Sequence, residues 1–149
     1  VTRDVLVYDP SLTLDISGTY TVDLSYSNRF QFSNSAVIKY SDMPSIYGKG
    51  DFSTFVVKVE QIVPGIFSVS DFFGGYYQEG RGLGAAYAMK GYMSVNSDNT
   101  IDLLSSLVNS WGDSLDGLAD ATYDPATQSL QWGAEYAGSY SFNVKLIKK

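Results

Sequence analysis

The chain has 149 residues, a length that fits one domain with a sizeable hydrophobic core. Sixteen acidic residues outnumber ten basic ones, and the basic residues are scattered, so we expect no binding to nucleic acid or to an anionic lipid surface. The absence of Cys and His excludes disulfides, thiol catalysis, a Ser-His-Asp triad and the commonest zinc ligands. We therefore expect neither a metal nor a cofactor.

The composition favours β-structure, because twelve Tyr, eight Phe and fourteen Gly accompany only 17% charged residues. The first segment, residues 1–14, holds a short candidate strand at 5–8 and a turn signal at 9–11. We interpret 1–14 as a linker or the tail of a preceding module, and 15–149 as the domain. An ordinary first strand of the domain is the alternative. Val1 is not an initiator Met, so we expect a processed product.

Alternation of apolar and polar residues predicts most of the strands. The alternation is clean from Gly18, where Tyr20, Val22, Leu24 and Tyr26 share one face. Further strands are predicted within 30–40, 52–63, 66–69, 85–95, 100–104, 121–123, 129–136 and 140–146, with a loop at 43–50 and an ambiguous segment at 105–119. About eight strands joined by short turns predict an all-β antiparallel meander, which resolves its edges by closing into a barrel or splitting into a sandwich.

The stretch 70–84 interrupts this pattern with five Gly, four aromatic residues and an Arg–Glu pair. Gly permits positive φ angles and close approach of the backbone, while Tyr and Phe supply large apolar areas. Such a stretch either closes one end of a β-structure or lines a mouth where a ligand binds. The sequence leaves both readings open.

Four motifs together resemble a known family: Val69-Ser70-Asp71-Phe72-Phe73-Gly74-Gly75-Tyr76-Tyr77, Gly80-Arg81-Gly82, Trp111-Gly112-Asp113-Ser114, and Tyr123-Asp124 with Thr127, Leu130 and Trp132. The sequence from about Gly18 to Lys149 resembles the C-terminal, lipocalin-like domain of surface lipoproteins of the Bacteroidetes type. The resemblance implies a lipocalin-like barrel or flattened barrel, preceded by an Ig-like module and anchored by a lipid outside this chain. It further implies export to the outer membrane or cell surface.

Carboxylates are the only residues here that support an enzymatic reading. Glu79 precedes Arg81, and Asp113 and Asp116 follow Trp111; two carboxylates flanking a sugar would make a glycosidase without His. The competing reading is an Arg–carboxylate pair or solvated loop acids, and we favour it. The acids from Asp113 to Asp120 lack the spacing of a calcium-binding EF-hand loop, so they are better read as turn caps.

Aromatic residues beside polar groups are the better candidates for a binding site, because they stack on sugar rings or other flat ligands. Trp132 lies on a face patterned for the core, which leaves Trp111 as the main candidate. The predicted ligand-binding residues are Tyr76, Tyr77, Arg81, Tyr87, Trp111 and Asp113. Tyr76 and Tyr77 would point to opposite sides of an extended strand, so we expect at most one to face a ligand.

These observations predict a monomeric, non-enzymatic accessory or binding module of an exported surface lipoprotein, with a glycan or small molecule as its partner. A glycosidase that uses carboxylates alone and a structural spacer without a ligand are the alternatives.

Overall fold

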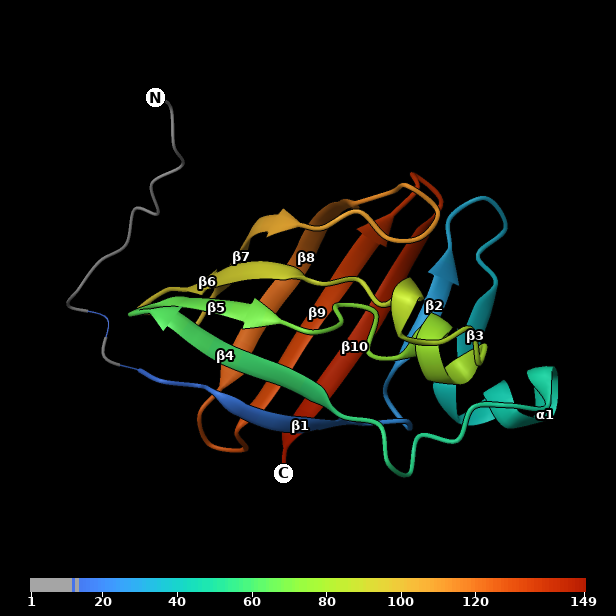
Figure 1. Cartoon of the computed structure of the whole chain (residues 1–149), viewed down its shortest axis with the longest axis horizontal. Helices are drawn as coiled ribbons and strands as arrows, with labels where there is room; N and C mark the ends of the chain where they lie inside the picture. The colour runs from blue at the N-terminus through green and yellow to red at the C-terminus, as the bar shows by residue number, and fades with distance from the viewer. Residues whose placement is uncertain (1–11, 13) are drawn as a thin grey trace.

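The computed structural model describes Leu12 and residues 14–149 (Figure 1). The candidate strand at 5–8 and the turn at 9–11 lie outside the described residues. The described chain is all-β with short helical turns, as predicted. Its strands are β1 (Gly18–Val22), β2 (Asn28–Gln31), β3 (Val37–Lys39), β4 (Val57–Val63), β5 (Ile66–Val69), β6 (Gly91–Val95), β7 (Ile101–Ser106), β8 (Leu115–Asp124), β9 (Ser129–Tyr136) and β10 (Tyr140–Lys148).

All pairings in the sheet are antiparallel, and β10 is its central strand. One side of β10 pairs with β9 over the whole of that strand, whereas the other side pairs first with β2 and then with β1. From β1 the sheet continues through β4, β5, β6 and β7, while β8 lies beyond β9 and β3 beyond β2. The sheet curls until β7 approaches β8, and an isolated bridge between Thr100 and Thr122 joins them. A curled half-barrel results (Figure 1).

Ten strands replace the roughly eight that the sequence predicts. The segment 30–40 divides into β2 and β3, and the ambiguous segment 105–119 contributes the first half of β8. Two predicted strands are shorter than expected: 52–63 pairs only as β4 and 85–95 only as β6. By contrast, β9 has the predicted bounds and β5 runs over the predicted residues.

Two local corrections have clear physical causes. The alternation that begins at Gly18 stops at Val22 because the Asp23 carboxylate accepts hydrogen bonds from the backbone amides of Ser25 and Tyr26 and turns the chain. The loop predicted at 43–50 contains the short helix α1 (Met43–Tyr47), which has Pro44 in its first turn and ends at Gly48 with a φ angle of 67°.

The core lies inside the curl of the sheet. One face of β10 is fully buried at Phe142, Val144 and Leu146, and Trp132 of β9 packs beside them. The indole nitrogen of Trp132 donates a 2.8 Å hydrogen bond to the backbone carbonyl of Phe72, so its polar atom is satisfied inside the core. The prediction that Trp132 is a packing residue is confirmed.

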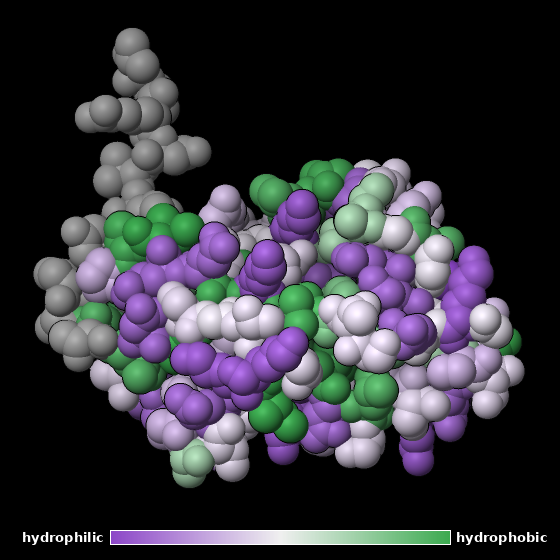
Figure 2. Space-filling model, turned by 60° about the horizontal axis from the view of Figure 1, so that its bottom comes forward, coloured by the Kyte–Doolittle hydropathy of each residue, from purple (hydrophilic) through white to green (hydrophobic). Residues whose placement is uncertain are grey.

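The remaining short elements gather at one end of the sheet, beside β2 and β3 (Figure 1). They are α1, the 3₁₀ turn η1 (Tyr40–Asp42), the π-helical turn η2 (Tyr76–Gly80) and the 3₁₀ turn η3 (Ala85–Tyr87). No helix in the described part of the chain is both long and apolar enough to span a bilayer. On the face turned forward in Figure 2, hydrophobic side chains form small separate patches among hydrophilic ones. On this face, a binding site is therefore to be sought in local groupings of side chains.

Candidate functional site

The glycine-rich stretch 70–84 closes one end of the core, and Asp71 holds it in place. The Asp71 carboxylate is buried and accepts three 2.9 Å hydrogen bonds, from the backbone amides of Phe73, Gly75 and Met89. Burial raises the pKa of Asp71 to about 6, although the three hydrogen bonds oppose this rise. One side chain thus fixes both the start of the stretch 70–84 and the segment around Met89 that follows it.

Tyr76 and Tyr77 lie in η2 rather than in an extended strand, so they do not point to opposite sides. Both rings pack against Phe142, with centroid distances of 5.1 and 5.6 Å. Tyr76 is fully buried and Tyr77 is 7% exposed. Burial raises the pKa of both hydroxyls, that of Tyr77 to about 12. The structure therefore makes Tyr76 a core residue, and Tyr77 reaches the surface only at its edge.

Three of the predicted site residues contact one another, and we call Tyr77, Tyr87 and Trp111 the aromatic platform. Tyr77 is buried, whereas Tyr87 and Trp111 are partly or largely exposed. The centre of the Trp111 ring lies 4.7 Å from that of the Tyr77 ring and 4.6 Å from that of the Tyr87 ring. The Trp111 ring plane is inclined to theirs by 76° and 59°. Trp111 remains 47% exposed, so about half of a large amphipathic side chain is open to a ligand.

Asn109 holds Trp111 in position. Its side-chain oxygen accepts hydrogen bonds from the backbone amides of Trp111 and Asp113, at 3.0 and 3.2 Å. Its side-chain nitrogen donates to the Tyr136 hydroxyl, which in turn donates a 3.0 Å bond to Asp113 Oδ2. Ser110 ties the same loop to η3 by donating to the carbonyl of Ala86. The platform is therefore preorganised, and a carboxylate lies on the same small loop.

Arg81 stacks on a tyrosine ring outside the aromatic platform. Its guanidinium carbon lies 4.8 Å from the centre of the Tyr47 ring, and Glu79 contacts Gln78 instead, at 3.5 Å. The expected Arg81–Glu79 pair is therefore not formed. Asp116 accepts a hydrogen bond from the backbone amide of Gly138. Within the described residues, no group of three or more Asp or Glu side chains is placed to bind a metal.

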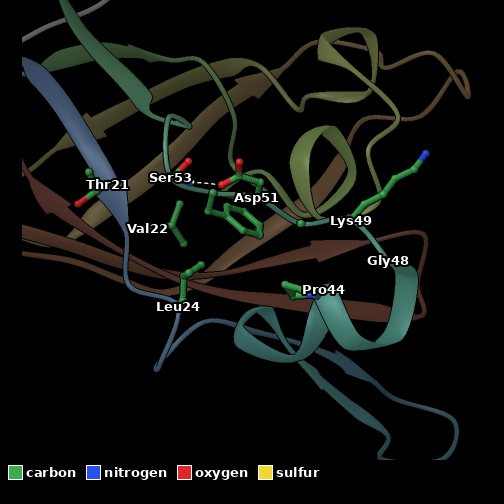
Figure 3. Close-up of a pocket in the computed structure, with 10 residues that line it drawn as sticks. Thr21, Val22, Leu24, Pro44, Gly48, Lys49, Asp51 and Ser53 are labelled. Atoms are coloured by element: carbon green, nitrogen blue, oxygen red, sulfur yellow. Dashed lines mark hydrogen bonds between the residues drawn. The ribbon is translucent and has the colours of Figure 1, made fainter.

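A groove of about 610 Å³ lies apart from the aromatic platform (Figure 3). Its apolar lining is made by Val22 at the end of β1, Leu24 just after that strand, Pro44 and Phe52. Asp51 caps its own turn by accepting a 2.9 Å bond from the amide of Ser53, and in Figure 3 the Lys49 amine points away from the apolar residues. The groove is wide but has few polar groups free to orient a ligand. We regard the preorganised platform as the better site.

Sequence reasoning missed several residues of these sites. Asn109 and Tyr136 carry no motif, since their roles depend on the loop 107–114 folding back onto β9. Arg29, Tyr47 and Tyr140 are far apart in the sequence, yet all three lie near η2. The only available signal was the abundance of Tyr, twelve residues in an acidic chain.

The match to a family model identifies the class of protein. A family model for a C-terminal domain matches residues 9–148, and the chain belongs to this family. The predicted resemblance to C-terminal domains of lipoproteins of the Bacteroidetes type is thereby confirmed. Comparison with curated proteins finds no match.

A particular solved structure is also similar to this chain. The lipoprotein BT2262 from Bacteroides thetaiotaomicron is 38% identical and superposes with a TM-score of 0.73. The similarity covers 91% of this chain but only 61% of BT2262. The chain therefore spans about three fifths of the length of that lipoprotein.

Proposed function

We propose that this domain is a non-enzymatic ligand-binding module of an exported surface lipoprotein, and that it holds a glycan or a similar small molecule at the aromatic platform. The observation that carries the proposal is the half-exposed Trp111, held in place by Asn109 and flanked by Tyr77 and Tyr87. An immobile aromatic surface binds a flat or ring-shaped ligand without a large ordering cost.

Asp113 supplies polar contacts beside the platform. One of its carboxylate oxygens accepts from Tyr136, which fixes the group without using its full capacity as an acceptor. An ionised carboxylate accepts hydrogen bonds from the hydroxyl groups of a sugar. Stacking on Trp111 combined with hydroxyl recognition by Asp113 is the chemistry of a glycan-binding site.

The placement of the carboxylates supports a binding role over glycoside hydrolysis. Asp113 and Asp116 are engaged with Tyr136 and with the Gly138 amide, and Glu79 lies in η2 beside Gln78. Asp71 has a raised pKa, as a general acid would, but it is buried and its oxygens accept three backbone amides. No reducing sugar should therefore be released from oligosaccharides incubated with the protein.

The similarity to BT2262, a lipoprotein, supports attachment to a membrane by a lipid outside this chain, with the domain facing outward. The outer membrane is the anchoring membrane we propose, and a monomer is the state we propose for the isolated domain. Fractionation of cells that produce the full-length protein tests the location.

A glycan array followed by tryptophan fluorescence titration tests the binding proposal. Trp132 is buried, so a ligand-dependent change in quenching by acrylamide reports on Trp111. We expect Trp111→Ala to weaken binding by about tenfold or more, equivalent to about 1.4 kcal/mol. Calorimetry provides the readout for this variant, because it lacks the fluorescent reporter.

Phe32→Ala is the matched control, since Phe32 is 45% exposed and lies outside the platform. Leu24→Ser tests the groove instead. Loss of binding in Leu24→Ser but not in Trp111→Ala would move the site to the groove. The absence of any hit at millimolar sugar would overturn the proposal in favour of a structural spacer.

A further inference from the structure

Arg29 in β2 has an unusual environment. Its guanidinium carbon lies 4.6 Å from the centre of the Tyr140 ring and 5.5 Å from that of Tyr76. Its Nε is buried and has no hydrogen-bond partner among the described residues. Its two terminal nitrogens form no hydrogen bond with a described residue either, and the residue as a whole is only partly buried.

A buried N–H without an acceptor is rare in folded proteins, and a charged one more so. Aromatic faces attract a guanidinium through their ring electrons but accept none of its five hydrogen bonds in the plane of the group. Acidic residues outnumber basic ones in this chain, so carboxylate partners are plentiful. Arg29 nevertheless packs against tyrosine rings, and the N–H groups of its guanidinium have no hydrogen-bond partner among the described residues.

A second arginine adjoins the same group of rings, which we call the tyrosine cluster (Tyr47, Tyr76, Tyr77 and Tyr140). Arg81 stacks on Tyr47, and the hydroxyls of Tyr47 and Tyr76 lie 3.2 Å apart. The positive charges of Arg29 and Arg81 both oppose the rise in the pKa of Tyr77. Both guanidinium groups therefore lie around one cluster of tyrosine hydroxyls.

A third cation lies close by. The Lys49 side chain lies against Gly82, the residue after Arg81. Glu79 contacts Gln78, Asp71 is buried, and Asp51, two residues after Lys49, accepts the backbone amide of Ser53. Neither Arg29 nor Arg81 forms an ion pair with any carboxylate that the structure describes. Three cations of an acidic protein, Arg29, Arg81 and Lys49, thus gather around the tyrosine cluster and the turn that follows η2.

We propose that Arg29 and Arg81, with the hydroxyls of the partly exposed Tyr47 and Tyr140, form a subsite for an oxyanion, the carboxylate or sulfate group of an acidic sugar. A guanidinium binds such groups through paired N–H donors, and tyrosine hydroxyls add further donors. The proposal deepens the function proposed above and rests on it, because Tyr77 contacts both Trp111 and Tyr76. A ligand on the aromatic platform therefore has the cluster as its neighbour.

The first test uses inorganic sulfate, which requires no glycan. Titration of the whole domain with sulfate, followed by NMR of the arginine side-chain N–H signals, should shift the signals of Arg29 and Arg81 in a saturable way. Arg29→Lys, which keeps the charge but loses the planar fork, should weaken binding by about tenfold. Lys145→Gln is the matched control, because Lys145 also lies over a tyrosine ring, Tyr26 at 5.8 Å.

The second test compares glucuronic acid and glucose 6-sulfate with glucose by calorimetry. Wild type should prefer the anionic sugars by about tenfold, and Arg81→Gln should remove the preference while leaving affinity for glucose unchanged. Trp111→Ala should weaken all three sugars. Arg81 directly follows η2 and is partly exposed, so we expect the Arg81→Gln variant to fold. It therefore still tests the subsite if an Arg29 variant fails to fold.

The outcomes separate the two proposals. Saturable shifts with sulfate but no effect of Trp111→Ala would retain the oxyanion subsite and reject the aromatic platform. If sulfate does not shift the arginine N–H signals, or shifts them equally in Arg29→Lys and wild type, the oxyanion subsite is overturned. This holds even if neutral sugars bind at Trp111.

Discussion

At the scale of single residues, Asp71 shows how one polar side chain organises an apolar end of the core. The acid is buried without a positive partner, yet each of its three backbone donors would otherwise be unpaired. Leaving such a donor unsatisfied costs about 1–3 kcal/mol, so the carboxylate stabilises the stretch 70–84 despite its own desolvation. The change of stability with pH shows whether burial or hydrogen bonding dominates the pKa of Asp71.

Stability should rise as the pH falls from about 6 towards 4. The pKa of Asp71 is about 6 in the folded state and near the ordinary 3.8 when unfolded, so in this range the folded state binds more protons. The unfolding free energy should therefore increase by up to about 3 kcal/mol, at about 1.4 kcal/mol per pKa unit. Below pH 4 the trend should reverse, because Asp15, Asp23 and Asp98 have lowered pKa values.

Urea denaturation at several pH values measures this effect. Asp71→Asn cannot ionise and should lack the rise between pH 6 and 4, while being less stable than wild type at every pH. The side-chain amide nitrogen that this substitution introduces would face a backbone donor, which explains that loss. A wild-type stability that is flat or falls from pH 6 to 4 would show that the hydrogen bonds outweigh burial in setting this pKa.

At the scale of elements, the stretch 70–84 depends on glycine in two ways. Gly74 has a φ angle of 60°, and a Cβ there would lie 2.7 Å from Val144 Cγ1 in the core. Gly138, between β9 and β10, has nearly the same φ angle, 61°, but open space around it. The pair therefore separates backbone strain from packing.

Gly138→Ala should cost about 1–2 kcal/mol, the penalty of a left-handed backbone for a residue with a Cβ. Gly74→Ala should cost about 1–3 kcal/mol more, because the added methyl group overpacks the core against Val144. Thermal or urea unfolding measures both variants. Equal losses would mean that β10 shifts to accommodate the methyl group and that the stretch is loosely packed.

Regular strands could be predicted from the sequence, and irregular elements could not. In β9 apolar and polar residues alternate in the sequence, and in β10 burial alternates through Phe142, Val144 and Leu146, so a period of two is readable in both strands. The five-residue helix α1 is too short to show a helical period, and η2 consists of residues that the pattern cannot distinguish from a loop. Local hydrogen bonds, such as those of Asp23 and Asp71, decide where the strands end.

The candidate site was predictable to a similar extent. Trp111, Tyr77 and Tyr87 could be proposed from residue type, but their meeting depends on the loop 107–114 folding onto η3. Arg29 could not be proposed, because nothing in the polar strand β2 indicates that two tyrosines from η2 and β10 will enclose its side chain. Long-range contacts of this kind have no signature in a single sequence.

At the scale of the whole molecule, the sheet is strongest at its centre and weakest where it nearly closes. β9 and β10 pair over eight successive residues. The approach of β7 to β8 rests on the Thr100–Thr122 bridge, a 2.9 Å bond from the Tyr123 amide to the Asn99 carbonyl, and a 2.7 Å bond from the Leu115 amide to Ser106 Oγ. We call this junction between β7 and β8 the seam. Because so few hydrogen bonds cross it, the seam can open without disrupting the rest of the sheet.

Hydrogen exchange should therefore reveal local opening at the seam. We expect the Tyr123 amide to exchange about tenfold or more faster than the paired amides of β9 and β10, which are released only by global unfolding. Binding of a ligand to the aromatic platform should slow exchange at the seam, because Trp111 lies on the loop that joins β7 to β8. Equal protection of Tyr123 and the β9–β10 amides would instead show that the curled sheet opens as one cooperative unit. The few hydrogen bonds between β7 and β8 would then hold the sheet closed as firmly as full strand pairing.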